Sequence, residues 1–64
     1  MKINKEKVQL RMAQQGLKQY EFAERAGVSR QTVSTVMNGR SCRPELLGRL
    51  AKALGVDVVE ILED

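Results

Sequence analysis

The chain lacks most of the residues on which catalysis and metal binding depend. Its 64 residues contain no histidine, no tryptophan, one cysteine and one proline, and only 3% of them are aromatic. Histidine is the commonest general base and the commonest metal ligand, and a lone cysteine cannot complete a zinc site. Cys42 has no imidazole to activate it as a nucleophile, so we expect it to be a small loop residue. The sequence therefore predicts no enzyme, no metal and no cofactor, and nothing in it indicates a small-molecule ligand.

Long apolar stretches are missing as well. No apolar run exceeds three residues, whereas a helix needs about 20 to cross a bilayer. A single cysteine allows no internal disulfide, and no signal-peptide pattern is present, which is typical of a reducing compartment. We therefore expect a soluble, cytoplasmic protein with no membrane partner.

Acidic residues are scarce in one part of the chain. Residues 1–44 carry nine basic and three acidic residues, a net charge of +6, whereas residues 45–64 carry two basic and five acidic residues, a net charge of −3. The stretch from Ser29 to Pro44 contains no acidic residue at all. Such an asymmetry favours a polyanionic partner, and nucleic acid before a membrane.

The residues that are present predict an all-α fold in one domain, residues 1–64. Apolar residues recur at helical spacing between glycines and the single proline, and no sustained alternation typical of a strand occurs. We expect five helices: one from an Asn4 cap to Gly16, one over Gln19 to Ala26, one from a Ser29 cap to Asn38, one from Pro44 to Gly55, and a short one capped by Asp57 in which Val58, Ile61 and Leu62 share a side. Lys18 specifies the second start only weakly, because a serine or threonine is the usual cap there.

The third predicted helix divides sharply into two faces. Val33, Val36 and Met37 form one narrow apolar stripe. The opposite face is polar or basic throughout and consists of Arg30, Gln31, Ser34, Thr35 and Asn38. A solvated face would normally mix charges of both signs, so we expect this face to meet an anionic partner.

A short turn, Gly27-Val28-Ser29, joins the second and third predicted helices. Two amphipathic helices of about two turns joined in this way are typical of a helix-turn-helix, whose second helix enters the DNA major groove. The spacing has physical reasons: Ala23 must be small where the helices cross, Gly27 must take a positive φ, and Val28 and Val33 must fill the corner. The sequence meets each requirement.

These residues also carry a family resemblance. The run LKQYEFAERAGVSRQTVSTVMNGR, from Leu17 to Arg40, resembles the helix-turn-helix of the Cro and lambdoid-phage repressor family, also called the XRE family. The run RPELLGRLAKALGVDVVEIL, from Arg43 to Leu62, is similar to the family's fourth and fifth helices. The resemblance implies a compact five-helix lambda-repressor-like domain that binds an inverted-repeat operator in double-stranded DNA as a homodimer, most simply as a repressor.

The resemblance also implies which residues touch DNA. Arg30, Gln31 and Thr35 would face base edges, and their chemistry agrees, because Arg pairs with guanine, Gln with adenine, and the Thr methyl group with thymine. The residues expected over phosphates are Gln19, Ser34, Asn38, Arg40 and Arg43. Several of these positions also have a purely structural explanation, such as a helix end at Asn38 or solvated loop charges at the arginines.

A second copy is expected because one module of this size buries only about 600–1,000 Å² on DNA, too little for an operator-grade choice of sequence. The surface that the sequence favours for this contact is Pro44 with Val58 and Ile61. The alternative, that Val58 and Ile61 only complete the core, stays open at this point.

Met12 and Met37 depart from the family pattern, since many members place an Arg and a Glu at the matching positions. An apolar pair can replace a buried ion pair without loss of stability, so we expect the two methionines to pack together.

The sequence leaves two other functions open. An antitoxin that autoregulates a toxin–antitoxin operon would need more chain than 64 residues readily supply. A helical protein-interaction module would show acidic or large apolar residues on the third helix, and the exposed positions there have neither.

Overall fold

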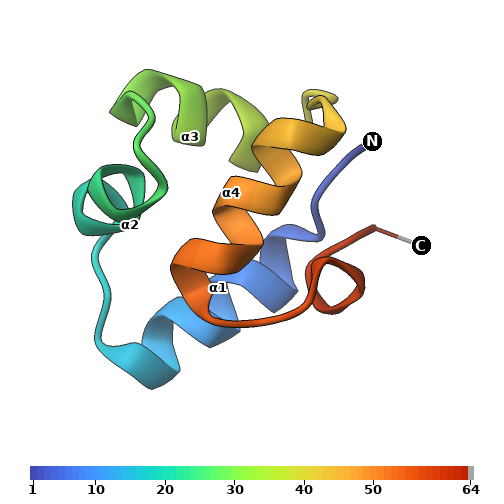
Figure 1. Ribbon diagram of the computed structural model, residues 1–64. Coiled ribbons are helices and arrows are strands. Elements are labelled where there is room, and N and C mark those ends of the chain that lie inside the picture. Colours follow the sequence, from blue (N-terminus) through green and yellow to red (C-terminus); the bar gives the residue numbers. More distant parts are fainter. Residues whose placement is uncertain (64) are drawn as a thin grey trace.

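The computed structural model describes residues 1–63 and is built from four α-helices (Figure 1). The helices are α1 (Lys5–Gln15), α2 (Gln19–Ala26), α3 (Arg30–Met37) and α4 (Pro44–Leu54), followed by a short 3-10 turn, η1 (Val58–Glu60). The all-α class is confirmed, and the starts and ends of the four α-helices agree with the sequence prediction.

Side chains and backbone groups at the helix starts explain these bounds. Asn4 Oδ1 accepts a hydrogen bond from the Lys7 amide at 3.1 Å, and so satisfies one of the donors that the first turn leaves free. At α2 the Lys18 side chain makes no cap, and Glu21 Oε1 instead accepts from the Lys18 amide at 2.9 Å. Glu21 therefore stabilises a start that looked weak from Lys18 alone, as the reciprocal half of a capping box does.

The short fifth helix expected after Asp57 is present only as a 3-10 turn, so the described chain has four α-helices where five helices were expected. Only the single turn η1 forms after Asp57, and the chain then leaves the helical path. The reason is tertiary: the Ile61 carbonyl accepts from the Asn4 amide at 2.7 Å, and the Glu63 amide donates to the Lys2 carbonyl at 2.9 Å. Ile3 and Leu62 form an isolated antiparallel bridge at this place. In a continuing α-helix the Glu63 amide would donate to the Val59 carbonyl, so its bond to Lys2 takes a donor that another helical turn would need.

The core lies around α4, which crosses the centre of the domain in Figure 1 and packs against α2 and η1. Its largest fully buried side chains are Phe22, Leu47, Leu50, Ile61, Val8 and Val33. Each of these contributes about 1.5–3 kcal/mol on burial. Of the described residues, none that is buried is polar or charged. The polar chemistry of the domain is therefore on its surface.

Met12 and Met37 both belong to this core and are 8% and 7% exposed. Direct packing of one methionine on the other stays a prediction, which a substitution experiment can test.

No helix among the described residues is long and apolar enough to span a membrane.

Candidate nucleic-acid interface

The turn between α2 and α3 has the geometry that the sequence predicts. Gly27 has φ +72°, a left-handed conformation that favours glycine. The Val28 amide donates to the Ala23 carbonyl at 3.0 Å and closes the end of α2. Ala23 and Val33 are buried where the two helices meet, and Val28 is partly buried against the same core. Together these contacts hold α3 at a defined angle to α2.

Ser29 specifies the start of α3. Its Oγ accepts from the Thr32 amide at 3.1 Å and lies 2.7 Å from the Thr32 hydroxyl. The predicted serine cap is confirmed, with Thr32 as its partner. Because the free amides and the helix dipole make a helix start electropositive, this end of α3 attracts anions.

The first turn of α3 differs from the first turns of the other helices. Among the four α-helices described, α1, α2 and α4 each carry a glutamate there, namely Glu6, Glu21 and Glu45, and α3 carries none. A carboxylate at this place usually stabilises a helix. Its absence from α3 leaves the positive end of the dipole uncompensated by protein, as suits a surface that meets a polyanion.

The three residues expected to face bases lie exposed on one side of α3. Arg30 and Gln31 occupy its first turn, and Thr35 follows one turn after Gln31. The Thr35 hydroxyl donates to the Gln31 carbonyl at 2.8 Å. Since its hydroxyl proton is used by the helix itself, Thr35 offers chiefly its methyl group to a partner, which is the group suited to thymine.

The residues expected over phosphates surround this face. Gln19 lies exposed in the first turn of α2, Asn38 ends α3, and Arg40 and Arg43 lie exposed in the loop before α4. Ser34 is only half-buried on α3. Four of the five are therefore exposed on α2, at the end of α3 or in the following loop, and Ser34 lies partly exposed on α3 itself.

A family model described as helix-turn-helix matches residues 8–61. The chain belongs to the Cro/C1-type helix-turn-helix family, the XRE family. It is a DNA-binding helix-turn-helix regulator, and α2 and α3 with the turn between them form its motif. The family is a regulatory one and typically not enzymatic.

Cys42 has a structural part in this helix-turn-helix domain that composition did not reveal. Its side chain is buried in the core, between the exposed Arg40 and Arg43, and its amide donates to the Met1 carbonyl at 2.6 Å. Burial raises the pKa of the Cys42 thiol, with the amino terminus opposing this in part. Cys42 therefore anchors the loop that carries the two arginines, and the thiol stays neutral.

Tyr20 is a further candidate for DNA contact that the sequence reading missed. Tyr20 is 46% exposed, and it lines a hollow of about 360 Å³ together with Glu24, Val28, Ser29 and Arg30. Tyr20 directly follows Gln19 in the first turn of α2, and this position in the sequence could have predicted it as a candidate. A tyrosine at this place presents a phenol next to the first arginine of the recognition helix.

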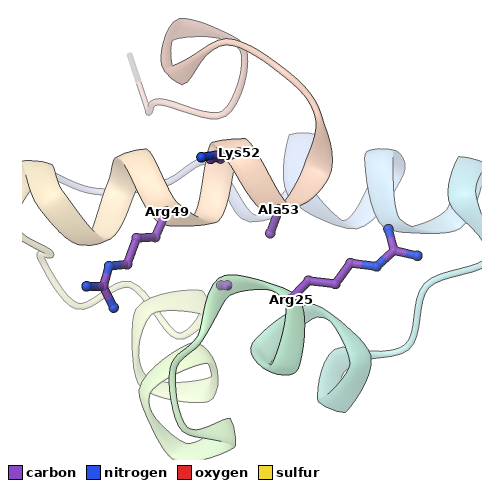
Figure 2. A pocket seen from close by; sticks show the side chains of 5 residues that line it. Arg25, Arg49, Lys52 and Ala53 are labelled. Atoms are coloured by element: carbon purple, nitrogen blue, oxygen red, sulfur yellow. The ribbon is translucent and has the colours of Figure 1, made fainter.

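A second group of basic residues lies on the flank formed by α2 and α4 (Figure 2). Arg25, Arg49 and Lys52 line a hollow of about 400 Å³ whose floor includes Ala26 and Ala53. In Figure 2 the side chains of Arg25 and Arg49 extend in opposite directions along the hollow. They do not converge on one point, so they add positive potential over this flank without forming a site for a small anion.

The three residues expected at the dimer surface differ in their exposure. Pro44 is exposed and Val58 is half-buried. Ile61 is 0% exposed and belongs to the core. A completely buried side chain has no area to offer a second copy, so the prediction that Ile61 lies on the dimer surface is wrong. The alternative explanation, that Ile61 completes the core, is the one the structure supports.

Proposed function

We propose that this protein is a repressor that binds an inverted-repeat operator as a homodimer, with α3 of each copy in the major groove. The observation that carries the proposal is the exposed side of α3, where Arg30, Gln31 and Thr35 stand next to an electropositive helix start without an acidic residue. A helix-turn-helix domain can repress simply by occupying its operator.

The two sets of polar residues have separate tasks in this proposal. Arg30, Gln31 and Thr35 read base edges and so select the sequence. Gln19, Ser34, Asn38, Arg40 and Arg43 hold phosphates, which positions α3 and makes binding depend on salt. Arg40 and Arg43 keep their places because Cys42 holds the loop between them in the core.

Selection of binding sites from random duplexes tests the proposal. The selection is run at about 150 mM salt, a level that screens non-specific contacts. We expect an enriched inverted repeat whose half-sites lie about 10 bp apart, one helical turn. If the selection enriches no inverted repeat, both the proposed operator and the proposed dimer are refuted.

Arginine variants then separate base reading from phosphate binding. Arg30→Ala is expected to cost about 1–3 kcal/mol and to relax the preference at one base position. Arg43→Ala is expected to weaken binding to all sequences equally and to reduce the salt slope by about 1. Arg25→Ala is the matched control, since Arg25 lies on the other flank of α2. Equal effects of Arg30→Ala on every sequence would remove Arg30 from the base contacts.

A further inference from the structure

The hollow between α2 and α4 takes no part in the proposed DNA contacts. It is lined by Arg25 and Ala26 of α2 and by Arg49, Lys52 and Ala53 of α4 (Figure 2). We name it the α2–α4 hollow. Arg49, Lys52 and Ala53 have the spacing i, i+3 and i+4, which places them on one side of α4. The hollow is therefore formed by one side of each of two packed helices.

The positive charges of the α2–α4 hollow are not neutralised by a carboxylate. Arg25, Arg49 and Lys52 are exposed, and among residues 1–63 none of them forms an ion pair. Arg25 Nη1 donates only to a neutral amide oxygen, Gln15 Oε1, at 3.5 Å. Of the described residues that line the hollow, none is acidic. Unbalanced charge of one sign attracts a partner of the opposite sign, so the hollow favours an acidic occupant.

The floor of the hollow differs from its rim. Ala26 is buried and Ala53 is half-buried, so the floor is apolar and its side chains are small. Arg25 and Arg49 extend in opposite directions along it (Figure 2), which spreads positive charge over the length of the hollow. An apolar centre with a polar rim is the usual anatomy of a protein–protein contact. A phosphate backbone would match the rim but bring little apolar surface to the floor, so the hollow favours a protein segment over nucleic acid.

The α2–α4 hollow is separate from the side of α2 that adjoins the recognition helix. Tyr20 and Arg30 line the hollow at the start of α3, and the two hollows have no lining residue in common. Arg25 follows Tyr20 by five residues, which places the two side chains about 140° apart around the axis of α2. A partner on the α2–α4 hollow therefore leaves the lining of the hollow at α3 unoccupied.

We propose that an acidic segment of a second protein docks in the α2–α4 hollow. Its carboxylates lie against Arg25, Arg49 and Lys52, and its small apolar side chains lie between them on the alanine floor. An amphipathic helix fits this description, because it carries a narrow apolar stripe between two charged edges. Exposed ion pairs are individually weak, so binding is modest and decreases as salt rises. The proposal goes beyond operator binding, because it gives the regulator a second partner on a separate surface.

A synthetic peptide tests the hollow. The peptide is a helix of about 20 residues, long enough to be helical in water, with a stripe of alanines between two rows of glutamates. A peptide of the same composition in scrambled order is the control. Fluorescence anisotropy of the labelled peptides should show that the striped peptide binds at least about fivefold more tightly than the scrambled one. Equal binding of the two peptides, or binding of neither, would overturn the proposal, because composition and general attraction would then explain everything observed.

Variants of the protein locate the contact. Arg25→Glu and Arg49→Glu should each weaken binding of the striped peptide at least about threefold more than Lys5→Glu does, since each replaces an attraction by a repulsion. Lys5→Glu is the matched control, because it makes the same change of charge at an exposed position of α1 outside the hollow. Ala53→Gln fills the floor without a change of charge and should also weaken binding. Equal losses in Lys5→Glu and Arg49→Glu would overturn the contact.

Two further measurements distinguish a protein partner from nucleic acid. Arg25→Glu and Arg49→Glu should bind a random-sequence duplex within about twofold of Lys5→Glu, because general attraction to phosphates changes equally in all three. A larger loss of duplex binding with peptide binding unchanged would assign the hollow to nucleic acid and overturn the proposal. These exposed substitutions should change stability little. If one of them unfolds the protein, an NMR titration of the wild type still decides: amide shifts should gather at the end of α2 and in α4, and shifts gathered in α3 would overturn the proposal.

Discussion

Ser29 is the residue at which stability and DNA binding can be separated most cleanly. Its Oγ accepts from the Thr32 amide at 3.1 Å at the start of α3. Loss of a serine cap costs about 0.5–2 kcal/mol, typically about 1 kcal/mol. For a domain of 60–100 residues, 1 kcal/mol corresponds to a shift of about 4–8 °C in Tm. We therefore expect Ser29→Ala to lower Tm by that amount.

Two further substitutions distinguish the hydrogen bond from other effects. Ser29→Gly should lower stability by only a few tenths of a kcal/mol, because glycine is tolerated at helix caps. Ser29→Asp should keep or raise stability, since a carboxylate caps well and is favoured near the positive end of the helix dipole, by about 0.3–1 kcal/mol. The same carboxylate would stand beside Arg30 on the DNA-facing surface, so Ser29→Asp should weaken DNA binding strongly, and more at low salt.

Thermal denaturation followed by circular dichroism gives the stabilities, and fluorescence anisotropy with an operator duplex gives the affinities. The reasoning predicts that the two measurements change in opposite directions for Ser29→Asp. An unchanged Tm for Ser29→Ala would show that the Thr32 bond contributes nothing. DNA affinity of Ser29→Asp equal to that of the wild type would show that the start of α3 does not approach phosphates or bases.

The remaining predictions concern the core. Met37→Glu should cost about 3–5 kcal/mol, because Met37 is 7% exposed and a lone carboxylate there has no partner; denaturant unfolding measures the loss, and Met12→Arg added to it should restore part of the stability only if the two side chains touch. If the stability of the double variant is no higher than the sum of the two single effects predicts, the two methionine side chains do not touch. Because burial raises the pKa of the Cys42 thiol, folding favours the neutral form, so this contribution to stability is present below the unfolded pKa of about 8.5 and is lost as pH rises above it. Denaturant unfolding at neutral and alkaline pH checks this against Cys42→Ala, which should lose less stability over the same interval; an equal loss would contradict it. Alkylation of Cys42 should also be much slower in the folded than in the unfolded protein.

Local features of the sequence determined the four α-helices. Caps at Asn4 and Ser29, Pro44 in a first turn and glycine at the ends of α1, α2 and α4 act within a few residues of their own positions. For the same reason the turn at Gly27 and the exposed side of α3 could be predicted. The periodicity of apolar residues follows from backbone geometry, and it divides each helix into faces without reference to the rest of the chain.

The end of the chain shows where local reasoning stops. Val58, Ile61 and Leu62 have helical spacing, but whether a helix forms depends on the Asn4 amide and the Lys2 carbonyl, which lie far away in the sequence. Those contacts turned the expected helix into η1 and placed Ile61 in the core. The periodicity of one segment carries no information about a distant segment that competes for its backbone groups.

The sequence by itself therefore determined the four α-helices, the all-α class and the polar side of α3 that we propose meets DNA, because each depends on neighbours in the chain. Only the tertiary structure decided that Cys42 holds the arginine loop, that Ile61 is buried, and that Leu10 and Glu60 line one hollow. These facts depend on which segments meet across the core. The helix-turn-helix, by contrast, is local to α2, α3 and the turn between them, whereas the hollow between α1 and η1 exists only when the two ends of the chain have packed together.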